Sequence, residues 1–263
     1  MKPDERKNLL GRTALVCGAS RGIGQACAME FAALGARVIL VARSRDALAA
    51  AREKLGQGDH EILAADFSEP ARLQEKVEKL VHRLGPIQIL LNNTGGPPSG
   101  MVFDAPADAF VAGFTAHLLC NQVLSQTLVP GMKLSGYGRI INIISTSVKQ
   151  PIRGLGVSNT VRAAVAGWAK TLSVELAPFG ITVNNLLPGA TRTDRLAEIM
   201  HARAQASGRS EQEVEAEMIR EIPAGRIGLP EEVAAAAGFL AGPRAAYITG
   251  VSLPVDGGRT QAL

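Results

Sequence analysis

The chain has 263 residues, which fits one large α/β domain or two small ones. It is 46% hydrophobic and only 4% aromatic, so it can bury a large core, and none of its apolar runs is long and continuous enough to span a bilayer. Its formal charge of +4 includes no block of five like charges, which disfavours nucleic-acid binding and is equally explained by an anionic small ligand.

Short apolar runs rich in β-branched residues alternate with helical patterns along the chain. We expect strands at 13–17, 37–42, 61–66, 87–93, 138–145, 181–187 and 250–258. We expect helices at 23–34, 45–55, from Pro70, near 106–134, at 158–179, within 194–221 and at 230–242. Strands that are apolar along their whole length predict a parallel sheet covered on both faces. Without repeats or a linker, residues 1–263 are interpreted as a single doubly wound Rossmann-type domain of about seven strands.

The segment 194–221 is more charged than the other helical regions. It follows the sixth strand, on the side of the sheet where ligands of such folds bind. It is either a solvated helix pair or a lid over a substrate. We favour the lid, because a polar insertion at this edge is otherwise hard to explain.

A glycine-rich stretch, CGASRGIG at 17–24, connects the first strand to the first helix. Glycines there allow a tight turn and close approach of a phosphate, and the helix N-terminus offers free N–H groups. NAD sites usually place a carboxylate at the end of the second strand, but Ala42 stands there and Arg43 follows. With Arg21 in the glycine loop as a second cation, the pattern predicts NADPH over NADH. The alternative is that both arginines are solvated surface groups.

Three cysteines and the scattered histidines carry little functional signal. The spacings of Cys17, Cys27 and Cys120 fit neither a zinc site nor a redox pair, so we interpret them as buried thiols in a reducing cytoplasm. No cluster has metal-ligand spacing, and we expect no metal site. The charged start MKPDERKNLLGR lacks the apolar stretch of a signal peptide, which also favours a cytoplasmic protein.

Five stretches together resemble the short-chain dehydrogenase/reductase family, and within it the bacterial 3-oxoacyl-[acyl-carrier-protein] reductase-like branch. They are CGASRGIG, NNTGG at 92–96, GRIINIIS, ITVNNLLPGATRTD and the tail from AGRIGLPEEVA to YITGVSLPVDGG. The resemblance implies an NADP(H) site, with Asp66 and Phe67 flanking the adenine. The cofactor residues that it implies or that the arginine argument adds are Gly18, Ser20, Arg21, Gly22, Ile23, Gly24, Arg43, Ser44, Asp66, Phe67, Asn93, Thr94, Gly95, Arg162, Pro188, Gly189, Thr191 and Thr193.

The sequence departs from this family at its catalytic positions, which are normally asparagine, serine, tyrosine and lysine. Ser145 matches the serine. Thirteen residues later Ser158 replaces the tyrosine, four beyond it Arg162 replaces the lysine, and twenty-eight before Ser145 the asparagine is His117. A serine hydroxyl is too weak an acid to protonate a developing alkoxide, and a guanidinium does not release its proton. We expect Arg162 to reach the cofactor ribose or a substrate carboxylate. His117 is the best remaining acid, because an imidazole ordinarily titrates near neutral pH.

Three functions are compatible with these residues. The first is an NADPH-dependent reductase of a small carbonyl or imine compound that uses His117, Ser145, Ser158 and Arg162. The second is a non-redox enzyme for proton transfer, dehydration or cleavage, and the third is a catalytically silent NADP(H)-binding protein. The helices near 106–134 and 158–179 are apolar around most of their circumference, which favours a homo-oligomer, a tetramer or dimer, through them.

Overall fold

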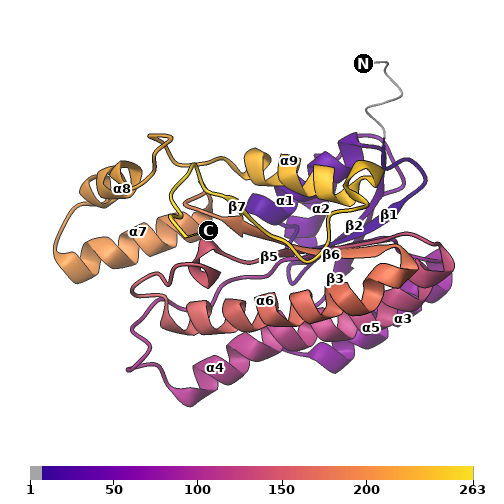
Figure 1. Ribbon diagram of the computed structural model, residues 1–263, viewed down its shortest axis with the longest axis horizontal. Coiled ribbons are helices and arrows are strands. Elements are labelled where there is room, and N and C mark those ends of the chain that lie inside the picture. Colours follow the sequence, from indigo (N-terminus) through magenta and orange to yellow (C-terminus); the bar gives the residue numbers. More distant parts are fainter. Residues whose placement is uncertain (1–7, 263) are drawn as a thin grey trace.

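The apolar runs form one parallel sheet in the computed structural model, which describes residues 8–262 (Figure 1). The sheet order is β3-β2-β1-β4-β5-β6-β7, and all six pairings are parallel. The strands are β1 (Thr13–Cys17), β2 (Arg37–Ala42), β3 (Glu61–Ala64), β4 (Ile89–Asn92), β5 (Gly138–Ile143), β6 (Ile181–Pro188) and β7 (Ser252–Val255). The expected fold class and seven strands are confirmed. Strand β7 is shorter than expected because Gly257 and Gly258, at φ 64° and 86°, turn the chain away after Asp256.

Helices cover both faces of the sheet, as Figure 1 shows. One layer comprises α1 (Gly22–Ala33), α2 (Arg45–Glu53) and α9 (Pro230–Ala241), and the other α3 (Pro70–Leu84), α5 (Cys120–Leu134) and α6 (Gly156–Leu176). Successive residues of β1 alternate between the layers: Val16 packs toward the first and Leu15 toward the second, both fully buried. Burial on both sides explains why these strands are apolar along their whole length.

The long helix expected near 106–134 is interrupted. It consists of α4 (Ala107–Phe114), a π-helical turn at Thr115–Leu119, and α5. A π turn inserts an extra residue into the helical hydrogen-bond pattern, and such turns are frequent at functional sites. His117 lies at the middle of this turn and is buried, so the direction of its side chain depends on the wider helical turn.

The charged segment 194–221 forms two helices, α7 (Asp194–Ser207) and α8 (Glu211–Arg220), which extend beyond the carboxyl edge of the sheet (Figure 1). Thr193 caps α7 by accepting from the Leu196 N–H, and Ser210 and Glu213 form a reciprocal capping box on α8. Gly208 joins the helices in the left-handed conformation, at φ 65°. Three short 3₁₀ turns complete the described chain, at Thr146–Val148, Ala177–Phe179 and Pro243–Ala245. Among the described helices, none combines the length and apolar character needed to cross a bilayer.

Candidate active site

The carboxyl ends of the strands border a cleft of about 730 Å³, placed where β1 separates β2 from β4 and the chain order reverses. Ligands of doubly wound sheets bind at this switch point. Segments that follow β1, β2, β4, β5 and β6 line the cleft, together with the first turns of α6 and α7.

The glycine loop forms one end of the cleft. The backbone here is packed closely, because a Cβ on Gly18 would lie 2.5 Å from Nδ2 of Asn93, and one on Gly24 would lie 2.2 Å from the Gly18 carbonyl oxygen. Side chains larger than hydrogen therefore do not fit at these two positions. The helix α1 that follows has neither a side-chain cap nor an acidic residue in its first turn. Its first N–H groups are left for an anionic ligand.

The two arginines expected to serve a 2′-phosphate differ in their surroundings. Arg43 is exposed, lines the cleft after β2, and makes no ion pair among the described residues. Arg21 instead pairs with Asp194 at 2.8 Å and lies 3.9 Å from Glu198, both on α7. The structure thus leaves Arg43 available to a phosphate, whereas Arg21 joins the glycine loop to the segment interpreted as a lid.

Most of the expected cofactor residues lie together along this cleft. Those that line it are Gly18, Ser20, Arg21, Gly22, Ile23, Arg43, Ser44, Phe67, Asn93, Thr94, Gly95, Arg162, Pro188, Gly189, Thr191 and Thr193. Gly24 and Asp66 are not among the lining residues. The Asp66 carboxylate accepts from the backbone N–H and the hydroxyl of Ser68, and these hydrogen bonds, before the charge of Arg43, lower its pKa.

Ser145, Ser158 and Arg162 converge on the same cleft from β5 and α6. Arg162 donates from Nε to the Ser158 hydroxyl at 3.2 Å, and from Nη1 to the carbonyl oxygens of Ile143 and Ile144 at 3.0 and 2.9 Å. The partial negative charges of these carbonyl oxygens compensate part of the positive charge of Arg162, and the hydrogen bonds hold its guanidinium against the end of β5. Burial, and then the positive charge of Arg195, lower the pKa of Arg162 to about 10, which still leaves it cationic at neutral pH.

His117 is placed differently from what its sequence position suggests. It is buried, it is not among the residues that line the cleft, and its Nε2 has no hydrogen-bond partner. Burial, followed by the positive charge of Arg162, lowers its pKa to about 3, although the nearby Gly95 carbonyl opposes this shift. The expectation that this imidazole titrates near neutral pH is therefore wrong. The physical reason is desolvation, which disfavours the charged form.

Neither tyrosine of the chain lies at the cleft. Tyr137 is buried at the opposite end of the sheet, where its hydroxyl donates to the Ala241 carbonyl and its ring packs against the guanidinium groups of Arg12 and Arg139. Tyr247 is fully exposed. Neither tyrosine of the chain therefore supplies a phenol to the cleft.

Arg195, which was not predicted as a site residue, comes from the first turn of α7 and lines the cleft. Its Nη2 donates to the Pro97 carbonyl at 2.6 Å and its Nη1 contacts Glu198 at 3.3 Å. Within the polar segment 194–221 its charge did not stand out. Only the packing of α7 against the loop after β4 shows that it points inward.

Comparisons with known proteins agree with this geometry. The family described as Enoyl-(Acyl carrier protein) reductase matches residues 18–260. The chain belongs to the short-chain dehydrogenase/reductase family. It is 31% identical to the NADPH-dependent reductase BacG of Bacillus subtilis, over 96% of this chain and 99% of that protein. It is 33% identical to the 3-oxoacyl-[acyl-carrier-protein] reductase FabG of Vibrio cholerae, over 95% and 98% of the two chains.

A solved structure shows the same fold. The L-sorbose reductase of Gluconobacter frateurii, complexed with NADPH and L-sorbose, is 30% identical and superposes with a TM-score of 0.90 over 98% of this chain and 100% of its own. The chain is therefore a short-chain dehydrogenase/reductase along nearly its whole length. Among residues 8–262 no group of three or more His, Cys, Asp or Glu side chains is arranged to hold a metal ion.

Proposed function

We propose that this chain is an NADPH-dependent reductase of a small carbonyl or imine compound, with Ser145, Ser158 and Arg162 as the groups that contact the reacting atom. The observation that carries the proposal is the convergence of these three side chains on the cleft that the glycine loop also lines. His117 takes part as a neutral imidazole behind the cleft wall, where it positions the loop around Gly95 rather than donating a proton from its charged form.

The cleft suits NADPH on three grounds. Its glycine loop excludes side chains where a pyrophosphate approaches, and at Gly95 a Cβ would meet nothing within 4 Å, which leaves room beside the strand end. Arg43 offers an unpaired cation at the end of β2. BacG is described as NADPH-dependent, and the sorbose reductase was solved with NADPH. When bound, this cofactor supplies a hydride.

The chain's own residues handle the charge that hydride addition creates. Ser145 and Ser158 can donate hydroxyl hydrogens to the substrate oxygen or nitrogen, and Arg162 places a fixed positive charge beside them. Because the site lacks a phenol, the proton that completes a carbonyl reduction comes from water. A protonated imine accepts hydride without any acid, which is why imines belong to the proposed substrate class.

Turnover with matched variants tests the proposal. NADPH oxidation is followed over a panel of aldehydes, ketones and cyclic imines, together with NADPH binding by fluorescence. We expect Arg162→Met to lower kcat/KM about 100-fold, as loss of a charge-stabilising donor does, while NADPH affinity changes only severalfold. Arg203→Gln removes the same charge from α7, away from the cleft, and should leave turnover unchanged.

The converse result would overturn the proposal. Measurable NADPH binding without turnover over the whole panel would identify a silent binding protein. Turnover that does not consume NADPH would identify a non-redox enzyme.

A further inference from the structure

Two guanidinium groups meet at Gly96, on the loop after β4. A Cβ placed on Gly96 would lie 3.4 Å from Nε and 3.5 Å from Nη2 of Arg195, and 3.7 Å from Nη2 of Arg162. One arginine comes from α6 and the other from α7, so the two cations approach the same point from different helices that both line the cleft.

This pair carries more positive charge than its protein neighbours neutralise. Arg162 has no carboxylate within ion-pair distance among the described residues, and its Nη2 makes no hydrogen bond there. Arg195 has one carboxylate partner, Glu198, whose side chain is 54% exposed. The charge of Arg195 also contributes to lowering the pKa of Arg162, which shows that the cations repel each other. An anion between them would relieve that repulsion.

Both guanidiniums are held in place before any ligand arrives. Arg162 is fixed by the carbonyls of Ile143 and Ile144, and Arg195 by the carbonyl of Pro97 at 2.6 Å. Guanidinium groups that are already ordered bind carboxylates through paired N–H donors with little further loss of freedom. The smaller Ser158, which stands where relatives carry a tyrosine, leaves space for a ligand directly beside Arg162.

We propose that Arg162 and Arg195 form a carboxylate-binding subsite, so that the substrate is a short oxo acid or its imine. The inference rests on the proposed reductase function for its chemistry. The Ser158 hydroxyl lies only 3.2 Å from Nε of Arg162. A substrate carbonyl held by Ser145 and Ser158 would therefore lie next to the guanidinium that binds the carboxylate, which favours an acid whose oxo group is close to its carboxylate.

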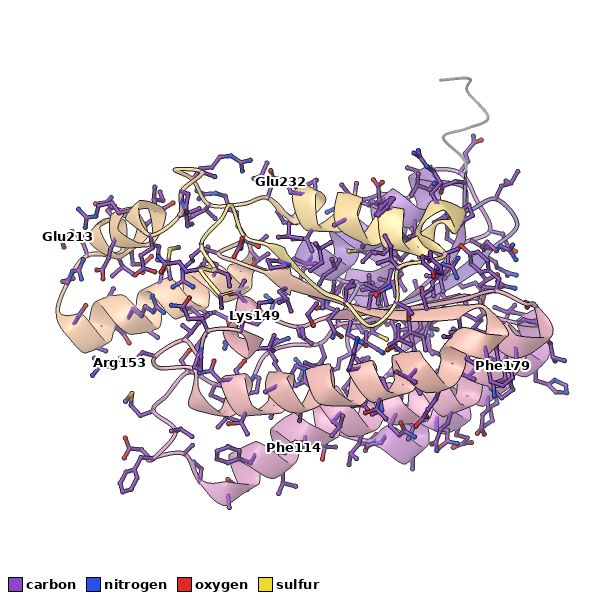
Figure 2. All side chains as sticks on the ribbon, in the orientation of Figure 1. Phe114, Lys149, Arg153, Phe179, Glu213 and Glu232 are labelled. Carbon is purple, nitrogen blue, oxygen red and sulfur yellow. The ribbon has the colours of Figure 1, made fainter. Side chains whose placement is uncertain are left out.

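Two further cations lie on the loop after β5 and add positive charge near a cleft whose lining also includes the carboxylates of Asp194 and Glu198. The loop that leaves β5 carries Lys149 and Arg153, and in Figure 2 both lie in the region between α7 and α6. Neither side chain makes an ion pair among the described residues. Their positive field would draw an acid toward the cleft, an effect that increases association rates and weakens with salt.

The test compares acids with their uncharged esters on protein saturated with NADP⁺. Calorimetry measures the binding of pyruvate and 2-oxobutanoate, each beside its methyl ester. We expect the acid to bind at least about tenfold more tightly than the ester, the size of one charge-assisted pair. Arg195→Gln should reduce this preference to about twofold or less, whereas Arg203→Gln on the same helix should leave it intact. Because loss of Arg162 could disturb β5, the charge-retaining variant Arg162→Lys is compared with Arg162→Met. Thermal melting checks that each variant folds.

The remaining outcomes separate this inference from the proposed function. Equal binding of acid and ester to the NADP⁺ complex would overturn the subsite while leaving reductase activity open to its own test. Binding of the acids only to cofactor-free protein, with displacement by NADP⁺, would also overturn it, because the arginines would then serve the cofactor phosphates. Tight acid binding by a protein that fails to bind NADPH would support the subsite and contradict the proposed function.

Discussion

Burial sets the protonation state of His117 and makes folding sensitive to pH. An unfolded histidine titrates near pH 6.5, whereas the pKa of His117 in the folded chain is about 3. Between these values the unfolded chain binds a proton that the folded chain does not. Stability therefore rises with pH across this window, and the contribution of His117 is complete above about pH 6.5 and lost as pH falls toward 3.

The variant His117→Asn, which introduces the asparagine that the family resemblance implies at this position, tests this linkage. At pH 5, protonation of His117 in the unfolded chain alone lowers the free energy of unfolding by about 2 kcal/mol. The wild type should therefore lose about that much more unfolding free energy than the variant between pH 7.5 and 5. Urea unfolding at the two pH values measures both losses. Parallel pH dependences would show that the buried imidazole takes up a proton without cost.

We predict that the preference for NADPH depends on Arg43. Because Arg43 makes no ion pair with the residues that the structure describes and lines the cleft, Arg43→Glu should weaken NADPH binding and favour NADH, shifting the affinity ratio by about 10- to 100-fold. Arg45→Glu introduces the same charge two residues later, outside the cleft lining, and should shift the ratio little. Fluorescence titration of both cofactors gives the ratio, and an unchanged ratio in Arg43→Glu would move the phosphate site elsewhere.

At the scale of secondary structure, α7 is joined to the glycine loop by an exposed ion pair. The Arg21 and Asp194 side chains are 65% and 66% exposed, so their pair contributes about 1 kcal/mol or less. We propose that so weak an ion pair, with the hydrogen bond from Arg195 to the Pro97 carbonyl, lets α7 and α8 move relative to the glycine loop. A lid over the cleft remains the proposal for this segment, and the ion pair supplies its contact with the glycine loop.

Hydrogen exchange tests the lid directly. If α7 and α8 close over bound ligands, their amides should exchange severalfold more slowly when NADP⁺ and pyruvate are both present. The amides of α3, on the far face of the sheet from the α1 layer, should keep their rates and serve as the internal control. Equal exchange of α7 and α8 with and without ligands would leave them a fixed, solvated helix pair.

Elements were predictable from the sequence where a periodic pattern decides the structure. The buried strands and most helices follow from apolar runs, and the glycine loop follows from its position between β1 and α1. The π turn at Thr115–Leu119 was missed because TAHLL has the same apolar character as the α-helix around it. The pairing of Arg21 with Asp194 and the inward direction of Arg195 depend on how α7 packs, and the pKa of His117 depends on burial. None of these three features can be predicted from the local sequence.

At the scale of the whole molecule, α5 and α6 leave apolar side chains uncovered. The two helices are joined by a hydrogen bond from Trp168 to Gln122 at 2.8 Å, and Lys133 lies over the ring of Phe179. On their outer surface Leu134 is 88% and Val174 69% exposed. Apolar groups gathered on adjacent helices are typical of a surface that another protein covers. Self-association through this face remains a proposal, and a second copy of the chain is the occupant we expect.

Mass measurement decides whether these helices associate. Light scattering after size exclusion should give a dimer or tetramer for the wild type, because burying Leu134 and Val174 removes apolar surface from water. Val174→Asp would place a charge in that interface and should shift the mass toward the monomer. Met29→Asp alters a residue of α1 that is 41% exposed, in the layer on the opposite face of the sheet from α5 and α6, and should leave the mass unchanged. A monomeric wild type, or an equal effect of the two substitutions, would show that α5 and α6 face solvent.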